Sequence, residues 1–217
     1  MSQNLTFTIP PHLNEYNIPL SSFKAARPQW TNFVVGGLVF SRSSRDSHHK
    51  PSEKGEPRVL LLQRALTDSL PGYWEGPGGG CEETDETILT AAAREVVEES
   101  GLHVSRIVDL VGIEEWTKEK NGTRLFVAKL AFLVEVHEAH GDFGEEIVGT
   151  EGQTTVEVDG DTVQRWEDRV RVEPSEHSTF EWATEEQVRL SLEGKGKYKI
   201  LDDEGRSLLK AFRMVAQ

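Results

Sequence analysis

Cysteine, basic residues and long apolar runs are all scarce in this chain of 217 residues. Its only cysteine is Cys81, so an internal disulfide is impossible and the composition suits a reducing compartment. Lys and Arg number 24 against 37 Asp and Glu, and the resulting net charge of -13 argues against nucleic-acid duplexes and anionic membranes as partners. No apolar run approaches membrane-spanning length and the N-terminus does not resemble a signal peptide, so we expect a cytoplasmic protein.

The length suits one domain with additional segments. We expect residues 1–30 to form an arm that packs on the domain or on the partner in a homodimer, because Tyr16, Leu20 and Phe23 are too apolar for a free tail. Residues 31–217 would form the domain, with an insertion at about 138–173. The insertion contains Asp159-Gly160-Asp161 between two Thr- and Val-containing runs, which predicts an exposed β-hairpin that serves as a lid, a dimer surface, a specificity element or inert decoration.

Apolar runs along the domain predict several strands. They also predict two helices in the last part of the chain. The strands are expected at residues 33–40, 58–66, 104–113 and 125–136, with a turn at 117–123 that contains the hairpin signal Asn121-Gly122. A short strand and a helix capped by Thr184 follow, and a last helix runs from Asp202 or Asp203 to about Val215. Strands on either side of a central helix predict an α/β fold, an α/β/α sandwich around a mixed sheet.

That central helix carries an unusual set of charges. Glu95, Glu98 and Glu99 stand at i, i+3 and i+4, so their carboxylates project from one side, and like charges at this spacing are unfavourable. A divalent cation would reverse the sign of that cost, because hard cations such as Mg²⁺ take carboxylate oxygens. We expect Thr84 or Asp85 to cap the helix at its start and Gly101 to end it in a left-handed conformation.

The segment from Gly80 to Leu102 resembles the signature of the Nudix hydrolases at every defined position. These positions are Gly80, Glu86, Arg94, Glu95, Val96, Glu98, Glu99, Gly101 and Leu102. The resemblance implies a Nudix-type fold and an enzyme that cleaves a diphosphate linkage with Mg²⁺ or Mn²⁺. It also implies that Glu95, Glu98 and Glu99 bind the metal, that Gly79 or Gly80 adds a carbonyl, and that Glu86 and Arg94 shape the loop and orient the glutamates.

Other residues are assigned on less of the pattern. Several Nudix subfamilies carry a Glu-His pair where this chain has Glu176-His177, and in some of them that glutamate completes the metal site or acts as the base. Glu98 or Glu176 would therefore accept the proton of the attacking water. Arg64 lies near a strand end, where it would meet a substrate phosphate or form a surface ion pair. Trp74 precedes the glycine loop where relatives carry an aromatic residue, so we assign Trp74 to the substrate, together with Gly79 of that loop.

The substrate itself stays open at this level. The resemblance favours a nucleoside diphosphate derivative or a nucleoside triphosphate. The apolar arm and the aromatic residues Phe126, Trp166 and Trp182 would suit a prenyl diphosphate instead. An alternative of another class is a non-catalytic Nudix module that only binds nucleotides. Such modules usually lack some of the glutamates of the signature, and all of them are present here. Cys81 has no His near it in sequence, which argues against a cysteine nucleophile.

Overall fold

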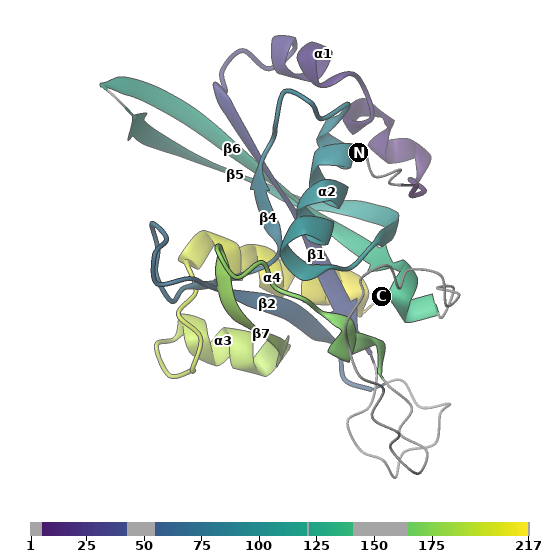
Figure 1. Cartoon of the computed structure of the whole chain (residues 1–217), viewed down its shortest axis with the longest axis vertical. Coiled ribbons are helices and arrows are strands. Elements are labelled where there is room, and N and C mark those ends of the chain that lie inside the picture. The colour runs from purple at the N-terminus through teal and green to yellow at the C-terminus, as the bar shows by residue number, and fades with distance from the viewer. Residues whose placement is uncertain (1–5, 43–54, 121, 141–164, 217) are drawn as a thin grey trace, which may run out of the picture.

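A mixed sheet forms the centre of the computed structural model, which describes residues 6–42, 55–120, 122–140 and 165–216 (Figure 1). Its main order is β3-β2-β1-β6-β5, with β4 paired to β1 and β7 paired to β2. β1 and β6 run parallel, whereas the other paired strands are antiparallel. The strands are β1 (Asn32–Ser41), β2 (Arg58–Arg64), β3 (Trp74–Glu75), β4 (Gly78–Gly80), β5 (Val104–Lys120), β6 (Thr123–Val136) and β7 (His177–Thr184).

Helices cover both faces of this sheet. The helices are α1 (Leu20–Ala25), α2 (Ile88–Ser100), α3 (Glu185–Leu192) and α4 (Asp202–Val215), with 3-10 turns at Pro11–Tyr16, His137–His140 and Trp166–Arg169. Along β2, Leu60 and Leu62 pack in the core cluster that contains α2, whereas Val59 and Leu61 pack in the cluster that contains α3 and α4. Alternate side chains of a strand point to opposite faces, so the sheet has a core on each side. The predicted α/β/α sandwich around a mixed sheet is confirmed.

The N-terminal segment contributes to the first of these cores. Leu13, Leu20 and Phe23 are buried, and the Tyr16 ring contacts Phe132 of β6 edge-on. The backbone N–H of Leu20 donates to the carbonyl of Glu86 at 2.8 Å, just before α2. The arm is therefore attached directly to the segment that leads into the acidic helix.

The hairpin of β5 and β6 is longer than predicted. We expected the turn at residues 117–123, but β5 continues to Lys120, which pairs with Thr123. Asn-Gly favours a two-residue connection, and such a tight turn lets the strands pair up to its edge. Both strands extend beyond the rest of the protein in Figure 1.

Most of the predicted insertion, residues 141–164 with the expected hairpin, lies outside the described residues. The described end of the predicted insertion packs on the domain, where Glu167 is buried beside Arg58 and accepts a hydrogen bond from the Ser41 hydroxyl.

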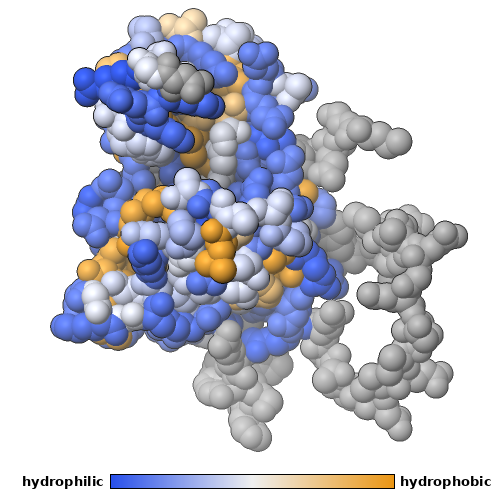
Figure 2. All heavy atoms as spheres, turned by 60° about the vertical axis from the view of Figure 1, so that its left-hand side comes forward, coloured by the Kyte–Doolittle hydropathy of each residue, from blue (hydrophilic) through white to orange (hydrophobic). Residues whose placement is uncertain are grey.

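The face shown in Figure 2 is mainly hydrophilic, with separate small hydrophobic patches. Within the described ranges, no helix has the length and hydrophobicity needed to cross a bilayer.

Candidate active site and metal centre

The cap of the acidic helix lies three residues after Thr84, the first predicted cap. Its N-cap is Thr87, whose hydroxyl accepts from the N–H of Thr90 at 3.0 Å, while the Thr90 hydroxyl accepts from the N–H of Thr87 at 2.8 Å. This reciprocal pair satisfies two free N–H groups, so the predictions of Thr84 or Asp85 as the cap were wrong. Gly101 ends the helix in the left-handed conformation with φ 69°, as predicted.

Arg94 organises the start of the site. Its Nε and Nη2 atoms bind the carboxylate of Asp85 at 2.9 and 3.1 Å, and its Nη1 atom binds Glu98 at 2.6 Å. Nη2 also donates to the Gly80 carbonyl at 3.0 Å and lies 2.9 Å from Glu95 Oε1. One guanidinium thus holds the loop and two acidic side chains of the helix in fixed relative positions.

Asp85 performs a role that the sequence reading did not assign to it. Its carboxylate accepts from the N–H of Glu82 at 2.7 Å in addition to binding Arg94. Glu86, which the resemblance implied as a loop-shaping residue, has an exposed side chain, and its carbonyl binds Leu20 of the arm. The spacing of Asp85 nine residues before Arg94 is a weak sequence signal, because the two meet only after the loop folds back on the helix.

Two of the three helix carboxylates are buried and crowded. Burial raises the pKa of Glu95 to about 7, against the attraction of Arg94, and the charges of Glu98 and Glu176 raise it further. Burial likewise raises the pKa of Glu99 to about 9, although its carboxylate accepts from the N–H of Gly78 at 2.7 Å. Glu98 differs, because 56% of its side chain is exposed. A positive charge beside Glu95 and Glu99 would lower the free energy of their ionised carboxylates.

The glycines before the helix form a short strand, where we had predicted a loop. Gly78, Gly79 and Gly80 pair with β1 in antiparallel register. A Cβ atom at Gly78 would lie 2.4 Å from the carbonyl oxygen of Val35, and one at Gly79 would lie 2.6 Å from Glu95 Oε2. Only glycine therefore allows β4 to approach both the neighbouring strand and the acidic helix.

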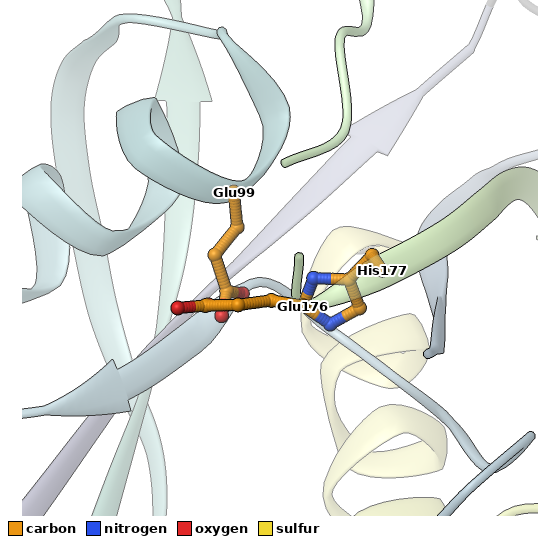
Figure 3. Close-up of side chains that lie close together, drawn as sticks. All are labelled: Glu99, Glu176 and His177. Carbon is orange, nitrogen blue, oxygen red and sulfur yellow. The ribbon is translucent and has the colours of Figure 1, made fainter. Parts of the chain in front are cut away.

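A second segment brings two further groups to Glu99. Glu176 immediately precedes β7, and His177 is the first residue of that strand. One potential ligand atom from each of Glu99, Glu176 and His177 lies within 4.8 Å of the others. Figure 3 shows the Glu99 side chain extending from α2 toward the other two side chains. The structure thus unites residues that are 77 positions apart, and the three form a group able to hold a metal ion.

Comparison with known proteins identifies the family of the chain. The family model for the NUDIX domain matches residues 51–203. The chain belongs to the Nudix family. It is accordingly a Nudix pyrophosphohydrolase, an enzyme that acts on phosphorus-containing acid anhydrides. No curated protein is similar enough in sequence to count as a match.

Solved structures of Nudix proteins resemble this fold. A MutT protein from Methanosarcina mazei is 21% identical over 86% of this chain and 95% of its own, with a TM-score of 0.47. An Ap4A hydrolase from C. elegans, in a binary complex, is 16% identical over 86% and 98%, with a TM-score of 0.47. The NUDIX domain of Shewanella oneidensis NrtR, solved with ADP ribose, is 13% identical over 85% and 88%, with a TM-score of 0.49.

Two of the three residues that we assigned to the substrate, Arg64 and Trp74, have other contacts in this Nudix domain. Arg64 binds Glu75 and Asp68, so of the two predicted alternatives the structure shows the ion pair. Trp74 is buried in the core beside Tyr198, with ring centroids 5.1 Å apart, and its indole faces other hydrophobic side chains. Side chains already engaged in these ways have little surface left for a substrate.

A buried ion pair supports the glycine-containing segment before β4, from the face of the sheet that α4 covers. Lys129 of β6 pairs with Glu204 of α4, and Glu204 Oε1 accepts from the N–H of Gly76 at 3.0 Å. Burial alone would lower the pKa of Lys129, but the charges of Glu204 and Glu75 outweigh it and the pKa is raised. The lysine is therefore charged at neutral pH, and its partner links α4 to the backbone that leads into β4.

Proposed function

We propose that this Nudix enzyme hydrolyses a diphosphate linkage in a nucleoside diphosphate derivative or a nucleoside triphosphate, and that it requires Mg²⁺ or Mn²⁺. The observation that supports this most directly is the convergence of Glu99 and Glu176 within 4.8 Å of one another. Glu99 is buried, so its carboxylate cannot be fully hydrated, and the nearby carboxylate of Glu176 repels it unless a cation or a proton neutralises the pair. Carboxylate oxygens are the ligands that Mg²⁺ and Mn²⁺ prefer.

The chain offers a complete set of groups for this ion. Glu95 lies against Gly79 and Glu99 accepts from the N–H of Gly78, so both approach β4 from the helix, and Glu98 lies on the same side of α2. The Gly80 carbonyl accepts from Arg94 and retains a second lone pair for a metal. When bound, the cation would neutralise the phosphate oxygens and lower the pKa of a water molecule.

The residues of the site then have separate tasks in the reaction. A water oxygen forms a bond to phosphorus, the bridging phosphorus–oxygen bond breaks, and one proton of the water passes to a carboxylate. Glu98 and Glu176 are the exposed carboxylates of the site, so one of them accepts this proton. Arg94 holds Glu95 and Glu98 in place, and Gly79 leaves the space that Glu95 occupies.

A panel assay tests the proposal. The purified protein is freed of metal with EDTA, and phosphate release from nucleoside triphosphates, dinucleotides, sugar nucleotides and an isoprenoid diphosphate is measured before and after addition of Mg²⁺ or Mn²⁺. We expect activity only with metal, and we expect Glu99→Gln to lower kcat by at least about 100-fold. Glu83→Gln, which removes an exposed acid of the same loop, is the matched control. Full activity after EDTA treatment, or in Glu99→Gln, would contradict the proposal.

The prenyl diphosphate alternative loses much of its support in the structure. Trp182 is buried and packs against Trp166, with ring centroids 5.2 Å apart, so both contribute to the core. The apolar side chains of the arm are also buried, including Phe23. Phe126 is exposed on the β5–β6 hairpin, where it lines an apolar groove with Trp30 and Trp116. Turnover of the isoprenoid diphosphate alone in the panel would restore this alternative.

A further inference from the structure

His177 is a buried residue whose side chain is only partly explained by the protein around it. The residue is 3% exposed, and its Nδ1 atom has no hydrogen-bond partner among the described residues. Such an atom is unfavourable in a folded protein, because burial removes its water and nothing replaces it. An unpaired buried nitrogen beside two carboxylates has the character of a metal ligand.

The other ring nitrogen has a defined neighbour. His177 Nε2 lies 3.7 Å from Glu75 Oε1, and Glu75 is held in turn by Arg64 Nη1 at 2.5 Å. Histidines that bind metals commonly direct their second nitrogen to a carboxylate, which fixes the ring orientation and keeps the proton off the ligating nitrogen. The Arg64–Glu75 pair supplies that carboxylate here, and it leaves Nδ1 as the nitrogen able to accept a metal.

We propose that His177 is a metal ligand, and that Nδ1 of His177 joins Glu99 and Glu176 in a mixed nitrogen–oxygen site selective for Mn²⁺ over Mg²⁺. This inference rests on the proposed function, since it adds a ligand to the same metal centre. Imidazole nitrogen binds first-row transition ions well, whereas Mg²⁺ strongly prefers oxygen.

Pulsed EPR of Mn²⁺ bound to the full-length protein tests the ligand directly. We expect a ¹⁴N modulation from a coordinated imidazole in the wild type. We expect that signal to disappear in His177→Gln, whose amide can still reach the position of Nε2 but not that of Nδ1. His12→Gln is the control, because His12 lies on the N-terminal arm beside Asp109. Its modulation should equal that of the wild type.

Binding constants measured by calorimetry provide a second readout. We expect Mn²⁺ affinity to fall by about tenfold or more in His177→Gln, with a smaller loss for Mg²⁺. Glu75→Gln tests the same arrangement without touching the histidine, and it should also weaken Mn²⁺ binding by about tenfold. Thermal unfolding of each variant without metal shows whether the fold is retained.

The outcomes separate this inference from the proposed function. Metal-dependent hydrolysis with no ¹⁴N modulation in the wild type, or with a modulation that survives in His177→Gln, overturns the assignment of His177 and leaves the proposed function standing. Absence of any divalent-ion binding to the wild type overturns both. Loss of the modulation in His177→Gln alone, with unchanged His12→Gln, supports the ligand set.

Discussion

Replacing Lys129 by Met should destabilise the protein, because it breaks a buried ion pair from one side. The side chains of Lys129 and Glu204 are 12% and 6% exposed, and they pair between β6 and α4. Met keeps most of the aliphatic volume but removes the charge, so Glu204 is left buried without its cation. Breaking a buried pair from one side typically costs about 3–5 kcal/mol, because the remaining charge is uncompensated.

The magnitude can be measured in two ways. Urea unfolding followed by tryptophan fluorescence should show a loss of about 3–5 kcal/mol in the free energy of unfolding. At about 2–4 °C per kcal/mol for a chain of this size, Tm should fall by about 6 °C or more. Lys118→Met removes an exposed lysine from the neighbouring strand of the same hairpin and should change stability by less than about 0.5 kcal/mol.

A double variant isolates the pair from the individual side chains. Lys129→Met combined with Glu204→Gln removes both charges, while the Gln carbonyl can still accept from the N–H of Gly76. We expect the double variant to be more stable than Lys129→Met alone, with a coupling free energy of about 2–3 kcal/mol. If Lys129→Met costs no more than Lys118→Met, the buried pair does not stabilise the fold and the reasoning is wrong.

Three further changes test individual parts of the site. Gly79→Ala places a Cβ atom 2.6 Å from Glu95 Oε2. Calorimetry should therefore show a metal affinity about tenfold weaker, at little cost in stability. Gly80→Ala is the control and should bind metal normally, because no atom lies within 4 Å of its Cβ. Thr87→Ala should cost about 1 kcal/mol in urea unfolding because it removes the cap of α2; an equal loss in Thr84→Ala would contradict that assignment. Burial, aided by the charge of Asp85, raises the pKa of Cys81 to about 12, so its thiolate is scarce at pH 8. Alkylation of the folded protein at that pH should be about a thousandfold slower than in urea, and comparable rates would show that the thiol is accessible and ionised.

The sequence was sufficient to identify the acidic helix and the family. The spacing of Glu95, Glu98 and Glu99 is a local property, because residues three and four apart share one side of any α-helix. Gly101 was equally readable, since only glycine enters the left-handed conformation at little cost. Apolar runs also predicted the strands that became β1, β2 and β6, whereas the short strands β3 and β4 were not predicted and β5 is longer than expected.

The tertiary structure decided which distant residues meet. His177 lies on β7 and Glu75 on β3, and nothing local to His177 places it beside Glu75 and Glu99. We assigned Arg64 and Trp74 to the substrate because of their positions in the sequence. In the structure, Arg64 forms an ion pair and Trp74 packs in the core. Pairing between strands far apart in the chain depends on sheet order and register, and a single sequence encodes these only through the packing of the whole domain.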